Sequence, residues 1–119
     1  MYLYRRGEEA VVSGEVLVVT GGSRGIGAAV ARRAAKAGWS VCFSYRAEQA
    51  VATALVAELR NLGVAARAVR ADMSAEGDIV HLFAAAAELG DVAGLVANAG
   101  IVADQRRLDQ VDADRVRQI

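Results

Sequence analysis

The chain has 119 residues, 55% of them hydrophobic, and its 14 basic side chains balance its 14 acidic ones. This composition predicts one globular unit with its own core, and the lack of net charge argues against nucleic acid or an anionic membrane as a partner. The single cysteine and the short apolar runs exclude an internal disulfide and a membrane-spanning helix, so we expect a cytoplasmic protein without a metal site.

Short apolar segments alternate with segments of helical periodicity along the chain. We expect residues 1–14 to form an N-terminal extension and residues 15–119 to form one dinucleotide-binding domain. Strands are predicted at residues 15–20, 41–45, 64–71 and 94–97, where the runs are short and mostly apolar. Helices are predicted around residues 26–37, 51–62 and 79–86, with ends near Gly38 and Gly63, and a further helix is predicted from Asp109.

This alternation predicts parallel strands joined by right-handed crossovers, and hence an α/β fold with a Rossmann-type doubly wound sheet. Four strands with three to four helices make only an incomplete sheet of this type. The strand at residues 94–97 is expected to have one edge unpaired. Such an edge invites pairing with another chain, including a second copy in a homo-oligomer.

A glycine-rich turn, TGGSRGIG at residues 20–27, joins the first strand to the first helix. Gly21 permits a sharp exit from the strand, Gly25 lets the backbone approach a phosphate, and Gly27 lets the helix lie close to the sheet. Backbone N–H groups and the helix dipole at this place favour an anion. The turn therefore predicts a pyrophosphate site, with a purely structural turn as the alternative.

The segment after the second strand indicates which dinucleotide binds. NAD-binding sheets usually carry an acid there that accepts hydrogen bonds from the ribose hydroxyls, but this chain has Tyr45 and Arg46. Arg46 and Arg24 can grip a 2′-phosphate together, because a guanidinium offers forked donors to phosphate oxygens. We therefore expect NADP(H), although either arginine alone has a solvated surface charge as its alternative interpretation.

Three motifs resemble those of the short-chain dehydrogenase/reductase family. Residues 20–27 look like its Thr-Gly-x-x-x-Gly-x-Gly turn, Asp72-Met73 resembles its adenine-contacting pair, and Asn98-Ala99-Gly100 resembles its Asn-Asn-Ala-Gly motif, departing from it at Ala97. The predicted cofactor-binding residues are Gly21, Ser23, Arg24, Gly25, Ile26, Gly27, Tyr45, Arg46, Asp72, Met73, Asn98, Ala99 and Gly100.

Two of these residues have a structural alternative. Asp72 is suited to cap the helix that follows it, a role open to Ser74 as well. Asn98 is suited to satisfy backbone groups at the end of its strand, although that place is also the carboxyl edge of the sheet, where ligands bind.

The resemblance also implies a catalytic tyrosine with a lysine four positions later, preceded by a serine and an asparagine. The sequence has one lysine, Lys36, and its tyrosines are Tyr2, Tyr4 and Tyr45, so no Tyr-x-x-x-Lys is present. We therefore predict no catalytic residue here. The chain is expected to be the truncated cofactor-binding half of an NADP-dependent oxidoreductase acting on a carbonyl or alcohol, and to be inactive alone. A non-catalytic nucleotide-binding or interaction module and a non-functional remnant remain as alternatives.

Overall fold

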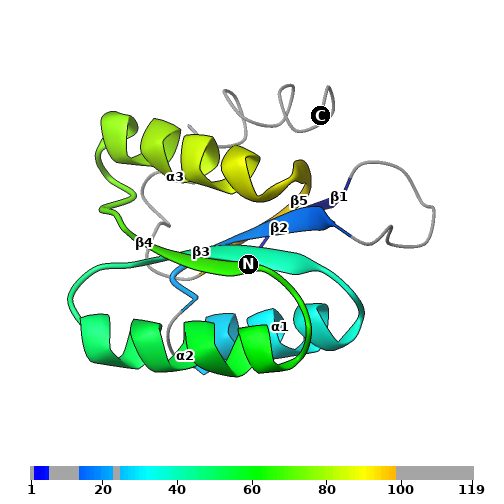
Figure 1. The fold of residues 1–119 in the computed structure, drawn as a ribbon. Helices are drawn as coiled ribbons and strands as arrows, with labels where there is room; N and C mark the ends of the chain where they lie inside the picture. Colours follow the sequence, from blue (N-terminus) through cyan, green and yellow to red (C-terminus); the bar gives the residue numbers. More distant parts are fainter. Residues whose placement is uncertain (1, 6–13, 23–24, 99–119) are drawn as a thin grey trace.

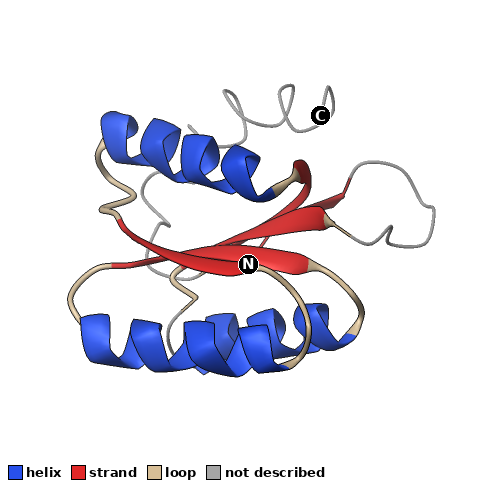
Figure 2. Ribbon diagram, in the orientation of Figure 1, coloured by secondary structure: helices blue, strands red, loops and turns tan. Residues whose placement is uncertain are grey.

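The computed structural model describes residues 2–5, 14–22 and 25–98, and it has three layers. One sheet lies between helices α1 (Gly25–Lys36) and α2 (Gln49–Asn61) on one face and α3 (Glu76–Leu89) on the other (Figure 1). Figure 2 shows the sheet edge-on, with the helices running alongside it. This is the arrangement that the alternating pattern predicts.

The sheet has the order β1-β5-β2-β3-β4. Its strands are β1 (Tyr2–Arg5), β2 (Glu15–Thr20), β3 (Ser40–Tyr45), β4 (Ala66–Arg70) and β5 (Asp91–Ala97). Strands β2, β3, β4 and β5 pair in parallel, so the predicted doubly wound sheet is confirmed. Each of these four strands lies within three residues of its predicted bounds.

The expectation of a bare edge on the last strand is wrong. Strand β1, from the segment assigned to an N-terminal extension, pairs antiparallel with β5, from Tyr2 opposite Ala97 to Arg5 opposite Gly94. The error has a physical cause: a four-residue strand has little local pattern, and its partner lies more than 80 residues away. The helix predicted from Asp109 lies outside the described residues.

Strand β2 is buried on both faces, and alternate side chains enter opposite halves of the core. Val16 and Val18 belong to the half under α3, whereas Leu17 and Val19 belong to the half over α1 and α2. This alternation is the two-residue period of a strand, and the apolar run is continuous because both faces are covered. Central strand β2 therefore anchors the turn that follows it.

Helix α1 meets the sheet through small side chains. Ala28, Ala31, Ala34 and Ala35 are all buried, which lets the helix axis approach the strands closely. The helix ends before Gly38, whose φ of 103° is the left-handed conformation expected for a glycine that terminates a helix. The close approach of α1 to the sheet brings its first turn against the end of β2.

Candidate functional site

The parallel strands end together at one edge of the sheet, and the described members of the predicted binding set lie at this edge. Thr20 at the end of β2 lies opposite Ala97 of β5, and Tyr45 at the end of β3 lies opposite Arg70 of β4. The glycine turn, the segment after β3, the loop before α3 and Asn98 all follow these ends. In doubly wound sheets, ligands bind outside this carboxyl edge.

Ser44 holds the first half of the glycine turn. The Gly21 N–H donates to Ser44 Oγ at 2.9 Å, and the Gly22 N–H donates to the Ser44 carbonyl oxygen at 3.0 Å. Gly21 has a φ of 68°, a left-handed conformation that glycine adopts without strain, as its predicted role requires. Sequence reasoning missed Ser44; the available signal was a polar residue in a buried apolar strand.

The second half of the turn is closely packed. A Cβ on Gly27 would lie 2.3 Å from the Gly21 carbonyl oxygen and 2.8 Å from Asn98 Nδ2, so the predicted close approach of helix and sheet is confirmed. Gly25, with a φ of 56°, begins α1, and Ile26 follows it with 63% of its surface exposed. The positive end of the α1 dipole and the first N–H groups of the helix therefore lie at Gly25, which has no side chain, and at the exposed Ile26. Ser23 and Arg24 lie outside the described residues.

Asn98 ties the end of β5 to the glycine turn. Its backbone N–H donates to Thr20 Oγ1 at 2.9 Å, and its side-chain Nδ2 donates to the Gly21 carbonyl oxygen at 3.3 Å. These two bonds support the structural interpretation of this residue and place its amide beside the turn. Ala99 and Gly100 lie outside the described part of the chain.

Asp72 shapes the loop before α3. Its Oδ1 accepts hydrogen bonds from the Ser74 hydroxyl at 2.7 Å and the Ser74 N–H at 2.9 Å. These bonds, and to a lesser degree the Arg46 charge, hold the pKa of the Asp72 carboxyl below its ordinary value. The N-cap position of α3 is Ala75, so neither Asp72 nor Ser74 is the N-cap residue.

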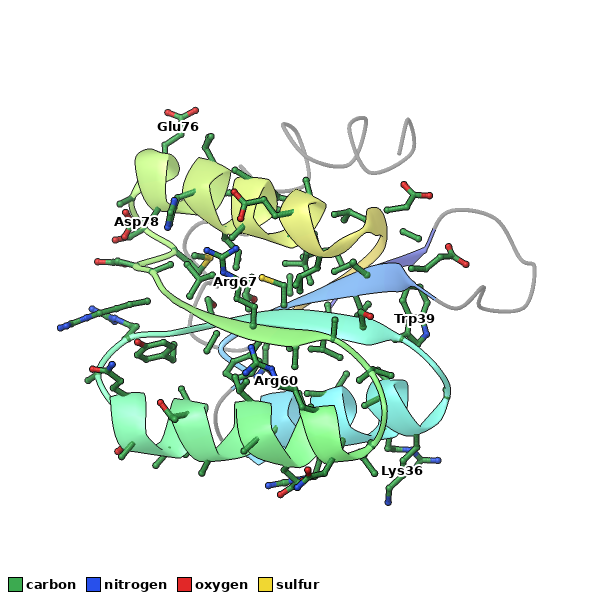
Figure 3. All side chains as sticks on the ribbon, viewed as in Figure 1. Lys36, Trp39, Arg60, Arg67, Glu76 and Asp78 are labelled. Atoms are coloured by element: carbon green, nitrogen blue, oxygen red, sulfur yellow. The ribbon has the colours of Figure 1, made fainter. Side chains whose placement is uncertain are left out.

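Two neighbours of Asp72 complete this loop. The Asp72 N–H donates to Oδ2 of Asp78, which lies in the first turn of α3 (Figure 3), at 2.8 Å. Met73 is 6% exposed and belongs to the core under α3, so any ligand contact from this residue would come from its backbone. The loop is thus fixed by its own hydrogen bonds and by one buried side chain.

Arg46 is the one of the two predicted phosphate-binding arginines that lies within the described residues. Its side chain is 77% exposed, and Nη2 lies 3.8 Å from Asp72 Oδ2. The backbone around it is fixed: the Arg70 Nε–H donates to the Arg46 carbonyl oxygen at 3.1 Å, and the Ala71 N–H donates to the Tyr45 carbonyl oxygen at 2.9 Å. Tyr45 itself is half-buried against the core over α1 and α2. The Arg46 guanidinium is therefore exposed, while the backbone that carries it is held by hydrogen bonds.

The described ranges contain neither a metal cluster nor a membrane span. Acidic, histidine and cysteine side chains form no group of three there that would hold a metal ion. No helix in those ranges has the length and apolar character to cross a membrane. Burial raises the pKa of the Cys42 thiol to about 11, so this residue is a small core side chain and not a nucleophile.

Comparisons with known proteins point to one family. The family model described as short chain dehydrogenase matches residues 15–119. The short chain dehydrogenase/reductase AacuN of Aspergillus aculeatus is 40% identical over 92 residues, which cover 76% of this chain and 35% of that protein.

Solved structures agree with this result. A blue fluorescent protein from a metagenomic library, in complex with NADPH, matches 67% of this chain with a TM-score of 0.64 and 44% identity. A variant of the actinorhodin polyketide ketoreductase with NADPH matches 73% with a TM-score of 0.64 and 38% identity. The chain spans only 34% and 33% of these two proteins.

Proposed function

Because this chain belongs to the short chain dehydrogenase family, we propose that it binds NADP(H) as the cofactor-holding part of an oxidoreductase that interconverts a carbonyl and an alcohol. The observation that carries the proposal is the glycine turn at the start of α1, with Arg46 at the neighbouring strand end. Two similar structures are complexes with NADPH, which supports the choice of cofactor.

The described residues fit such a cofactor in three places. Gly25 and the first N–H groups of α1 would hold the pyrophosphate, because no atom of the described residues lies within 4 Å of a Cβ built on Gly25 and the helix dipole attracts an anion. Arg46 would hold the ribose 2′-phosphate, and Asp72 and Met73 would border the adenine. Asn98 would keep the turn and the end of β5 together while the cofactor is bound.

The chemistry supplied by the bound cofactor is hydride transfer at its nicotinamide ring. The described residues would bind and orient the cofactor. None of them provides the tyrosine and lysine pair with which the family transfers the proton. Because Tyr-x-x-x-Lys is absent from the sequence, we predict no turnover of carbonyl substrates with NADPH by the purified 119-residue chain. Absorbance of NADPH over time measures this, and a rate above that of buffer would contradict it.

The cofactor choice is tested by titrating the chain with NADPH and NADH in a calorimeter. We expect tighter binding of NADPH, and we expect Arg46→Asp to weaken NADPH binding by about tenfold or more while sparing NADH, because a carboxylate repels the 2′-phosphate. Arg33→Asp, an exposed change of the same charge in the last turn of α1, is the control. Equal affinities of the parent chain for both nucleotides would rule the proposal out.

The alternative of an interaction module loses its main support. That interpretation depended on an unpaired edge of β5, and β1 occupies this edge. A nucleotide site at the carboxyl edge of the sheet is therefore the function that the geometry favours.

A further inference from the structure

A second arginine stands beside Arg46 at the ends of β3 and β4. Arg70 is the last residue of β4 and lies opposite Tyr45, so its side chain starts next to the segment that carries Arg46. Its Nε–H donates to the Arg46 carbonyl oxygen at 3.1 Å. This bond uses Nε alone, and within the described part of the chain the donors of the two Nη groups have no hydrogen-bond acceptor.

Arg46 lies near an acidic side chain, whereas the hydrogen bond of Arg70 ends on a carbonyl oxygen. One carboxylate, that of Asp72, lies 3.8 Å from Arg46 Nη2, and its other oxygen accepts both hydrogen bonds from Ser74. Asp78 Oδ2 accepts a hydrogen bond from the Asp72 N–H, so a second carboxylate lies next to Asp72. Arg70 is exposed, so its charge is available to a ligand in solvent.

Arg67, on the same strand, differs from Arg70 in the partner of its guanidinium. Its Nη1 lies within an ion pair with Glu88 Oε2, on the side of the sheet that faces α3 (Figure 3). The Arg67 charge is therefore compensated locally, whereas the Nε–H bond of Arg70 ends on a neutral carbonyl oxygen. The two residues share a strand and a side-chain type but differ in the charge they present at the edge.

We propose that Arg70 is a second specificity residue for the 2′-phosphate of NADP(H). Through Nε it fixes the backbone of the segment that carries Arg46, and through its Nη groups it offers a second cation to the same phosphate. A phosphate dianion has three terminal oxygens and can accept from two guanidinium groups at once. This inference rests on the proposed NADP(H) function and assigns it a residue that sequence motifs do not mark.

The test compares three variants of the full chain, Arg70→Ala, Arg70→Lys and the matched control Arg67→Ala, in calorimetric titrations with NADPH and NADH. We expect Arg70→Ala to weaken NADPH binding by about three- to tenfold and to change NADH binding by less than about twofold. Arg70→Lys keeps the charge without the fork, so part of the NADPH affinity should return. Arg67→Ala should leave the ratio of the two affinities unchanged.

The outcomes separate this inference from the proposed function. If Arg70→Ala weakens the binding of both nucleotides equally, Arg70 only supports the segment after β3 and the inference is overturned. Unchanged binding of both nucleotides overturns it too. In either case a parent chain that prefers NADPH still supports the proposed function. If the parent chain binds both nucleotides alike, the proposed function and this inference fail together. Thermal unfolding of each variant monitors folding, and Arg70→Lys provides the comparison if the alanine variant does not fold.

Discussion

Gly27 lies where the first turn of α1 crosses the end of β2, and it leaves no room for a side chain. A Cβ would come within 2.3 Å of the Gly21 carbonyl oxygen, which belongs to a closely packed backbone. We expect Gly27→Ala to lower the free energy of unfolding by about 1–3 kcal/mol, since the helix must move away from the sheet. The same shift separates the α1 N-terminus from the glycine turn, so NADPH affinity should fall as well.

The control for this change is Gly77→Ala in α3. Nothing lies within 4 Å of a Cβ built on Gly77, and its backbone is helical. Alanine there should stabilise the protein by about 0.5–1 kcal/mol, because it restricts the unfolded chain and favours the helix. Urea unfolding of both variants gives the two free energies. A Gly27→Ala variant as stable as the parent would contradict the packing at this turn.

Four residues of the site show which roles can be predicted from the local sequence and which cannot. The conformational roles of Gly21 and Gly27 could be predicted, because each follows from the residue type in a strand, turn and helix. The roles of Ser44 and Arg70 could not, because their partners lie 23 and 24 residues away on neighbouring segments. Only the folded sheet brings these pairs into contact.

At the scale of elements, the loop between β4 and α3 has a pH dependence of its own. Hydrogen bonds from Ser74 hold the pKa of the Asp72 carboxyl below its ordinary value in the folded protein. A carboxyl group with a depressed folded pKa contributes stability above its unfolded pKa and loses it as the pH falls through the folded pKa. Asp72→Asn should therefore unfold at a lower temperature than the parent at neutral pH, and the difference should vanish in acid.

This prediction has a direct check on the group itself. The Asp72 carboxyl carbon can be titrated by NMR in the parent and in Ser74→Ala, which removes the hydroxyl donor. We expect the Asp72 pKa to rise in the variant toward its ordinary value, because the Ser74 hydroxyl is the largest cause of the shift. An unchanged pKa would show that the backbone N–H of residue 74 is sufficient.

The bounds of an element were predictable where its apolar pattern stops at a glycine. The ends of α1 and α2 near Gly38 and Gly63 match the left-handed glycines found there, with φ of 103° and 93°. Strand β5 begins at Asp91, three residues before the predicted start, because Gly94 interrupts the apolar pattern while the backbone continues to pair with β2. Pairing across a sheet therefore extends strands beyond what a local apolar run indicates.

At the scale of the whole molecule, β1 closes the sheet in an unexpected direction. The order β4-β3-β2-β5 corresponds to the first four places of a doubly wound sheet, and β1 lies antiparallel in the next place, where that sheet adds another parallel strand. The parallel core was predictable from alternating elements. The closing strand was not, because residues 2–5 are too few to carry a periodic pattern.

Removing β1 should therefore expose the backbone of β5 to other chains. We expect a variant with residues 2–5 replaced by Gly-Ser-Gly-Ser to associate at lower concentration than the parent, because an unpaired strand edge is a template for intermolecular pairing. Residues opposite β1, from Gly94 to Ala97, should also exchange their amide hydrogens faster.

Sedimentation velocity over a range of concentrations measures the first effect, and hydrogen exchange at low concentration measures the second. The replacement keeps the chain length, so a changed assembly state cannot come from shortening the chain. Equal sedimentation and equal exchange in the two proteins would mean that β1 does not protect this edge in solution.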